Sequence, residues 1–145
     1  MKFSDNWFSA TAQADNGNLI FVTGRDDLNE TRLGGKYNER VEIYWHYTAA
    51  DNGMPVDAEG ELLETVLEAL RKAMEPKDHL AVLTGIYTGN GERTLVFYTR
   101  NGRAFGERLN EALAEFPQLP IEIYVEKDAE WNEYQEMYEI KSFAD

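Results

Sequence analysis

The sequence predicts an α+β fold: a ferredoxin-like antiparallel sheet with two helices on one face, plus an N-terminal β-hairpin and a short C-terminal helix. The first observation is a pair of β-branched and aromatic runs within residues 79–100, separated by a turn rich in glycine and asparagine at residues 88–92. The second is an apolar pattern of helical period over residues 57–74. The third is the element order strand, helix, strand, strand, helix, strand from residue 37 to residue 127, which is the split βαβ arrangement.

The first 36 residues predict a hairpin followed by a loop. Residues 6–14 alternate weakly, residues 15–18 are typical of a turn, and residues 19–23 read as a strand. Residues 24–36 are polar, hold three glycines and show no sustained period. We therefore expect a surface loop there, of the kind that is often mobile.

The first half of the predicted core holds a strand and a long helix. Residues 37–48 alternate, with Val41, Ile43, Trp45 and Tyr47 on one side of the strand. We expect Asp57 to cap the helix that follows and the proline at position 76 to end it.

The second half of the core starts with the hairpin at residues 79–100, which has apolar side chains on both faces. That composition favours the interior of the sheet over an edge. A second helix is predicted at residues 103–115 and a strand at residues 121–127, whose outer face carries Glu122, Tyr124 and Glu126.

We expect one domain over residues 1–145, with a βαββαβ core at 37–127, the hairpin and loop at 1–36 and the C-terminal helix at 128–145. In the ferredoxin-like topology the first core strand has a neighbour on each side. The N-terminal hairpin should therefore extend a sheet edge or cover the open face. The alternative is a meander of the first three strands, which would displace the ferredoxin-like order.

The charge balance bears on the partners of the chain. Fourteen basic and 27 acidic residues give a net charge of −13. A surface this negative repels phosphate backbones, so direct binding to nucleic acid is disfavoured, whereas a cationic protein would be attracted. The alternative is that the charge serves only to keep a small domain soluble.

The composition argues against cysteine-based sites and against secretion or membrane insertion. The chain has no cysteine, which excludes disulfides, thiolate nucleophiles and zinc-thiolate centres. No apolar run resembles a signal peptide or a membrane span, so we expect a cytoplasmic protein with no membrane contact.

Catalytic signals are weak throughout the chain. The two histidines, His46 and His79, lack the spacing of a metal-binding pair. Residues 34–37 superficially resemble a phosphate-binding loop but lack its first glycine and its Ser or Thr. We therefore expect no enzyme, no cofactor and no metal.

The most unusual composition lies at residues 126–139, where aromatic residues alternate with carboxylates. Such a surface could anchor a basic partner. We add the acidic residues of the predicted loop at 24–36 to this candidate surface. Their spacing is not that of a calcium-binding loop. The candidate partner-binding residues are Glu130, Trp131, Glu133, Tyr134, Glu136, Tyr138, Asp26, Asp27 and Glu30.

The alternative for the C-terminal segment is an amphipathic helix, capped by Asp128 and running from residue 129 to about residue 138. In that case Trp131, Tyr134 and Tyr138 pack on the sheet while the glutamates face water. This second interpretation is favoured, because an aromatic stripe at helical spacing usually belongs to a core.

Four features together resemble the bacterial domain of unknown function 695 family. They are Trp7 before the first hairpin, the helix at residues 55–74, the glycine-rich hairpin at residues 85–98 and the ending Asp128-x-x-Trp131-x-x-Tyr134. The chain is also distantly similar to the acidic regulators of ribonuclease E activity, which act by protein binding. The resemblance implies the fold and supplies no catalytic residues.

These observations favour a non-enzymatic acidic domain that binds a basic protein, as a monomer or homodimer. The most specific version is an immunity or inhibitor protein that masks a basic nuclease toxin. One alternative is a regulator of a ribonuclease or another cytoplasmic enzyme. The other is a small-ligand-binding domain with a pocket between the open sheet face and the loop at residues 24–36.

Overall fold

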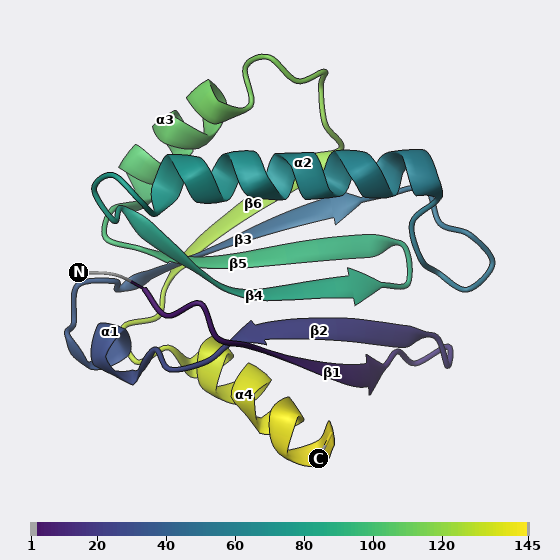
Figure 1. The fold of residues 1–145 in the computed structure, drawn as a ribbon, viewed down its shortest axis with the longest axis horizontal. Helices are drawn as coiled ribbons and strands as arrows, with labels where there is room; N and C mark the ends of the chain where they lie inside the picture. Colours follow the sequence, from purple (N-terminus) through teal and green to yellow (C-terminus); the bar gives the residue numbers. More distant parts are fainter. Residues whose placement is uncertain (1–2, 145) are drawn as a thin grey trace.

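A computed structural model describes residues 3–144 as a six-stranded antiparallel open sheet with helices on both faces (Figure 1). Residues 1, 2 and 145, the ends of the predicted domain, lie outside the described residues. The strand order is β1-β2-β4-β5-β3-β6. The elements are β1 (Trp7–Gln13), β2 (Leu19–Arg25), α1 (Asn29–Leu33), β3 (Glu39–His46), α2 (Asp57–Met74), β4 (Ala81–Gly89), β5 (Glu92–Thr99), α3 (Gly102–Ala112), β6 (Ile121–Lys127) and α4 (Asn132–Ala144).

The hairpin of β4 and β5 forms the centre of the sheet, as its composition predicts. Its turn is made by Asn90 and Gly91, which both have positive φ, 55° and 84°. β4 pairs with β2 on its outer side and β5 pairs with β3. Within residues 39–127 the four strands therefore stand in the order β4-β5-β3-β6, with every neighbour antiparallel.

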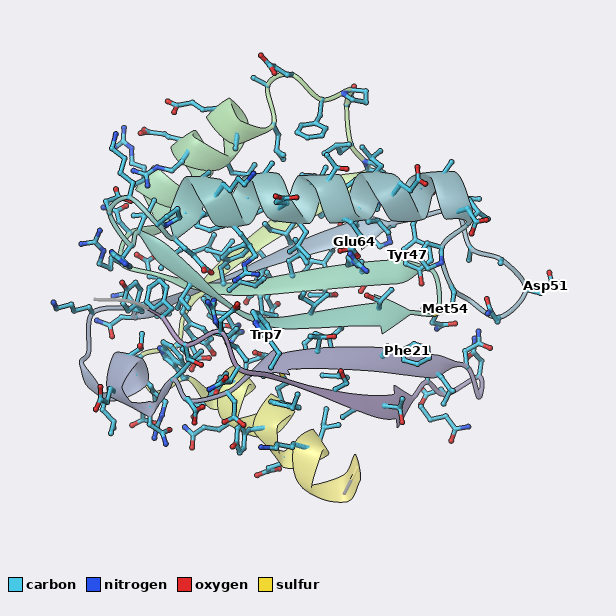
Figure 2. The ribbon with its side chains drawn as sticks, in the orientation of Figure 1. Trp7, Phe21, Tyr47, Asp51, Met54 and Glu64 are labelled. Carbon is cyan, nitrogen blue, oxygen red and sulfur yellow. The ribbon has the colours of Figure 1, made fainter. Side chains whose placement is uncertain are left out.

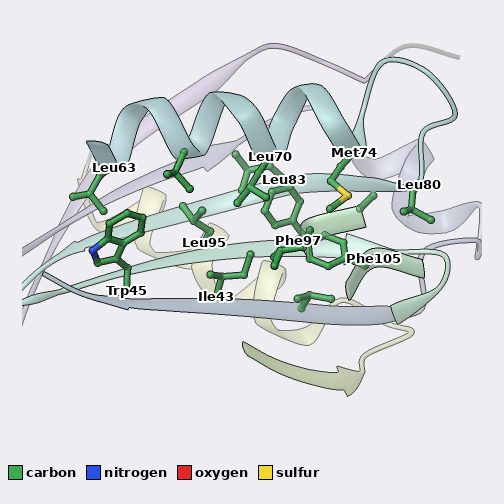
Figure 3. Packing of buried hydrophobic residues seen from close by; sticks show 14 of the residues in the cluster. Ile43, Trp45, Leu63, Leu70, Met74, Leu80, Leu83, Leu95, Phe97 and Phe105 are labelled. Atoms are coloured by element: carbon green, nitrogen blue, oxygen red, sulfur yellow. The ribbon is translucent and has the colours of Figure 1, made fainter. Parts of the chain in front are cut away.

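One face of the sheet is covered by α2 and α3. The apolar stripe of α2, including Leu63 and Leu70, packs with Phe105 of α3 against Ile43 and Phe97 of the sheet (Figure 3). Both helices contribute to the same buried cluster, so they occupy one layer.

The prediction that Asp57 caps α2 is wrong. Val56 holds the cap position without a side-chain hydrogen bond, and Asp57 is the first residue of the helix. Its carboxylate and that of Glu59 lie in the first turn, where the helix dipole favours negative charge.

The opposite face is covered over part of its width by α4. Trp131, Tyr134 and Met137 are buried together with Val82 and Tyr98 of the central hairpin. This confirms the interpretation of the aromatic stripe as core for Trp131 and Tyr134. None of the helices within residues 3–144 has the length and apolar character that a membrane crossing requires.

Helix α4 starts later than its pattern predicts, at Asn132 rather than Ala129. Trp131 has a positive φ of 59°, which interrupts helical geometry just before the start. Asp128 does cap the helix, because its carboxylate accepts the N–H groups of Asn132 at 2.8 Å and Glu133 at 3.2 Å.

The N-terminal hairpin extends the sheet beyond β4. Thr23 of β2 pairs with Ile86 of β4, and no pairing joins β2 to β3 among residues 3–144. The alternative of a three-strand meander is therefore wrong. The physical reason is that both sides of β3 are already occupied, by β5 and β6.

The prediction of a surface loop at residues 24–36 is confirmed in part: residues 26–36 apart from Leu28 are exposed or half-buried, but the segment contains regular structure. Gly24 and Arg25 complete β2, residues 29–33 form α1, and Leu28 is buried. The Arg25 guanidinium lies inside the protein, with Nη1 2.8 Å from Glu75 Oε2 and 3.1 Å from the Leu83 carbonyl oxygen. A buried charge needs such partners, and they hold the end of β2 in place.

Candidate protein-binding site

A hollow of about 390 Å³ lies between α1 and α4. Its charged lining residues are Asp26 and Asp27 of the turn before α1, Arg32 of α1 and Glu139 of α4. The two acidic groups that the sequence singles out lie about 100 residues apart in the chain, and the fold brings them together. Tyr138 Oη donates to Asp26 Oδ1 at 2.9 Å, which directly joins the two segments. We call this region the α1/α4 hollow; its lining includes Asp26, Asp27, Asn29, Arg32, Gln135, Tyr138 and Glu139.

The turn that follows β2 holds the two aspartates at the rim of the hollow. The N–H of Asp26 donates to the Asn6 carbonyl oxygen at 2.7 Å, continuing the β1–β2 pairing. Asp27 then adopts a positive φ of 58°, which aspartate tolerates better than most residues. Asn6 Nδ2 donates to Asp27 Oδ2 at 2.6 Å and holds the side chain in place.

The chain's own lysine shows how Asp26, a lining residue of the hollow, holds a cation. Lys141 Nζ lies 2.7 Å from Asp26 Oδ2, and the ring centres of Tyr138 and Phe8 are 5.1 and 5.5 Å away. The hydrogen bond from Lys141 is the main reason that the pKa of Asp26 is lowered. A carboxylate and aromatic faces together favour an ammonium or guanidinium group.

Two of the predicted contact residues belong to the core, although Tyr134 also lines the hollow. The Trp131 indole N–H donates to the Tyr37 carbonyl oxygen at 2.8 Å, and Tyr134 Oη donates to the Arg25 carbonyl oxygen at 2.6 Å. Both side chains are buried, at 1% and 4% exposure. Their contribution is to hold α4 on the sheet.

Glu133 also differs from the pattern, which places it in water. Its Oε1 accepts the Tyr87 hydroxyl at 2.6 Å, and the side chain is mostly buried under α4. Glu30, Glu130 and Glu136 are exposed, and Tyr138 is half-buried. The accessible part of the predicted surface thus consists of these glutamates, Tyr138 and the two aspartates of the turn.

A charged network on the open face of β3 and β6 was missed by sequence reasoning. The Arg40 guanidinium lies 2.6 Å from Glu126, 2.8 Å from Asp128 and 3.1 Å from Glu42. The alternation of polar residues in both strands predicts that these side chains lie on an outer face. The register that pairs Arg40 with Glu126 depends on the tertiary structure and cannot be read from the sequence.

Asp128 links this network to the core. Burial opposes its ionisation, but hydrogen bonds from the Asn132 N–H and the Tyr98 hydroxyl, the latter at 2.7 Å, outweigh that effect and lower its pKa. The same carboxylate therefore caps α4 and holds Arg40.

A second hollow, of about 420 Å³, lies beside Phe3, Arg71 and Glu75. Trp7, labelled in Figure 2, has the guanidinium carbons of Arg25 and Arg71 at 5.0 and 5.3 Å from its ring centre. Arg71 also lies 3.6 Å from Glu75, so charges of both signs are paired in its wall. Within residues 3–144 no group of three or more histidine, aspartate or glutamate side chains could hold a metal ion.

A family model described as "Family of unknown function (DUF695)" matches residues 5–138. The chain belongs to this family. The match begins before β1 and ends within α4, so it includes every lining residue of the α1/α4 hollow except Glu139. No curated protein and no solved structure matches the chain. The similarity to regulators of ribonuclease E activity stays a prediction.

Proposed function

We propose that this DUF695 domain is a non-enzymatic protein-binding domain that recognises a basic protein through the α1/α4 hollow. The observation that carries the proposal is the meeting of Asp26 and Asp27 with the acidic and aromatic residues of α4 around a space of about 390 Å³. Lys141 already pairs with Asp26 and lies against Tyr138, which illustrates the chemistry expected of the partner.

A lysine or arginine of the partner would enter the hollow between Asp27 and Glu139 and lie against Tyr138. A cation–π contact at an exposed site contributes about 0.5–1 kcal/mol, and an exposed ion pair up to about 1 kcal/mol. One side chain is therefore too little for a stable complex, and several basic residues of the partner must contact the surrounding glutamates. The net charge of −13 would speed the encounter and make it sensitive to salt.

The most specific form of this proposal is an immunity or inhibitor protein of a bacterial cytoplasm that masks a basic nuclease toxin. The alternative is a regulator that engages a ribonuclease through the same surface. For the fold, we infer a ferredoxin-like core; the strand order β4-β5-β3-β6 and the shared layer of α2 and α3 support that inference.

The test is affinity capture from source-cell lysate with three baits in parallel. They are the wild type, Glu136→Lys/Glu139→Lys on α4, and Glu111→Lys/Glu115→Lys at the end of α3 and just after it as the matched control. Both variants replace two exposed glutamates by lysine, so their net charge is the same.

We expect one basic protein to be held near stoichiometrically by the wild type and the control, partly released at high salt and absent from the α4 variant. Equal retention by all three baits would mean that net charge alone attracts the partner. An empty wild-type bait that carries a small molecule in native mass spectrometry would favour the small-ligand alternative.

A further inference from the structure

Strand β6 forms a free edge of the sheet with an exposed apolar centre. It pairs with β3 on one side and is the last strand in the order. Ile123, Tyr124 and Val125 are 45%, 48% and 44% exposed, although apolar residues in strands are usually covered. In Figure 1 β6 and the β1–β2 hairpin lie at opposite edges of the sheet.

The direction of the backbone groups of β6 follows from two hydrogen bonds at its ends. The His46 N–H donates to the Pro120 carbonyl oxygen at 3.1 Å, and the Asp128 N–H donates to the Asn38 carbonyl oxygen at 2.8 Å. Antiparallel pairs alternate between bonded and non-bonded positions, so the even-numbered residues between them also face β3. The N–H and C=O groups of Ile123, Val125 and Lys127 consequently point away from the sheet.

The two rows of side chains along this edge differ in chemistry. Ile123 and Val125 lie on the helix side, opposite Ile43 and Val41 of β3. On the other side stand Glu122 and Glu126, with side chains 77% and 51% exposed and Tyr124 between them, and further carboxylates from the neighbouring strands, Glu42 and Glu92. Arg40 of β3 pairs with Glu126 and Glu42 on this face, so the four carboxylates outnumber its single guanidinium. An incoming strand would meet an apolar row on one face and a negative row on the other.

We propose that the β6 edge binds an extended basic segment of a partner protein by strand addition. The segment would alternate apolar residues with lysine or arginine, matching the two rows of β6. Main-chain hydrogen bonds to Ile123, Val125 and Lys127 would give affinity, and the glutamates would select the basic sequence. This surface is separate from the α1/α4 hollow, so the inference goes beyond the function proposed above.

Charge decides between a basic strand and a second copy of the chain. Pairing of β6 with itself would gather Glu122 and Glu126 of both copies on one face, and like charges along a strand pair are destabilising. Natural edges are usually protected by lysine, proline or a bulge. Here Pro120 and Lys127 stand at the ends of the strand, and its centre carries no such residue.

The experiment follows backbone amide exchange by NMR on the full chain, with two synthetic heptapeptides as probes. One alternates valine with lysine and the other alternates valine with glutamate. With the lysine peptide we expect the amides of Ile123, Val125 and Lys127 to exchange at least about tenfold more slowly. The amides of Glu122, Tyr124 and Glu126 should change little, since they already face β3.

A variant and a modified peptide test the role of the backbone. Val125→Pro removes an outward N–H without removing a β3–β6 hydrogen bond, and Val125→Thr is the matched control that keeps the N–H and the branched side chain. We expect Val125→Pro to weaken binding of the lysine peptide at least about tenfold and Val125→Thr to bind it. The lysine peptide N-methylated at alternate residues should also fail to bind the wild type, which tests the proposal without changing the protein.

Three results would overturn the strand-addition proposal. They are the absence of protection at saturating lysine peptide, equal binding of the glutamate peptide, and protection of the β6 amides that rises with protein concentration in the absence of peptide. The last would identify a second copy as the occupant. Glu136→Lys/Glu139→Lys should bind the lysine peptide as the wild type does, so a failure at the α1/α4 hollow and a failure at β6 are distinguishable.

Discussion

At the scale of single residues, Glu133 shows how an acidic segment can serve the core. Its carboxylate accepts the Tyr87 hydroxyl, and its Oε2 has no hydrogen-bond partner among the described residues. Burial raises the pKa of Glu133 above its ordinary value of 4.5. A change to lysine here would bury an ammonium group, so the residue is unsuited to a test of surface charge.

Glu133→Gln should reduce the pH dependence of stability. Because the folded state holds the proton of Glu133 more tightly than the unfolded state, the free energy of unfolding should fall as pH rises from about 4.5 through the raised pKa. Glutamine has no proton to lose and keeps an acceptor for Tyr87. Urea unfolding at a series of pH values between about 4 and 8 measures this. An identical pH profile for both proteins would contradict it.

Asp128 has the opposite effect on the pH dependence of stability. Its pKa is lowered, so its stabilisation is present above its ordinary value of 3.8 and is lost as pH falls through the lowered pKa. Asp128→Ala leaves Arg40 and Tyr98 without their shared acceptor and should cost about 3–5 kcal/mol in the free energy of unfolding. Asp128→Asn keeps an acceptor for the start of α4 and should cost less. If both variants lost the same free energy of unfolding in urea, the Asp128 side chain would not stabilise the protein by capping α4.

At the scale of elements, α4 fits the sheet through a pair of glycines. Gly24 of β2 and Gly85 of β4 are opposite each other in register. A Cβ atom on Gly85 would lie 2.5 Å from Met137 Sδ. One on Gly24 would overlap first with the Phe8 ring and would also lie 2.9 Å from Met137 Cε. The two glycines therefore leave the space that the Met137 side chain occupies.

Gly85→Ala should destabilise the protein by about 1–3 kcal/mol, because a methyl group would overlap with Met137. Shortening the opposing side chain should relieve the overlap, so Gly85→Ala should cost less in a Met137→Ala background than in the wild type. A double-mutant cycle in urea unfolding gives the coupling energy. If the losses from Gly85→Ala and Met137→Ala were simply additive, the two residues would not be in contact, and α4 would have to pack elsewhere on the sheet.

The elements that the sequence predicted best are those with local signals. The β4–β5 hairpin has its turn residues, and α2 has its apolar stripe, so both lie where the pattern places them. The segment at residues 24–36 has no such signal. Arg25 is buried because of Glu75, which lies 50 residues later, and no local pattern reports that pairing.

The candidate site was predictable in its parts but not as a whole. Composition singled out the aspartates of residues 24–36 and the acidic, aromatic segment of α4. Their meeting through Asp26 and Tyr138 spans 112 residues and depends on how α4 crosses the sheet. The exposed centre of β6 depends likewise on strand order, since Ile123 and Val125 would be covered in an interior strand.

At the scale of the whole molecule, the sheet has a separate apolar layer on each face. The α2/α3 layer and the α4 layer form two distinct buried clusters. The second cluster joins the N-terminal hairpin to the core, because Val22 of β2, Val82 of β4 and Trp131 are buried in it together. Helix α4 therefore stabilises the edge of the sheet that carries one wall of the α1/α4 hollow.

A chain shortened to residues 1–127 should lose this second layer. Val82, Val96 and Tyr98 would face water, so we expect increased binding of an apolar dye and a lower urea midpoint, with β1 and β2 losing amide protection first. A chain of residues 1–138 is the matched control, since it keeps Trp131, Tyr134 and Met137 and loses the contact between Lys141 and Asp26. That control should unfold close to the wild type, while its α1/α4 hollow lacks Glu139 and the cation beside Asp26. If the chain of residues 1–127 unfolded as the wild type does, the second layer would contribute nothing to stability, and α4 would have to be regarded as an appendage of the sheet.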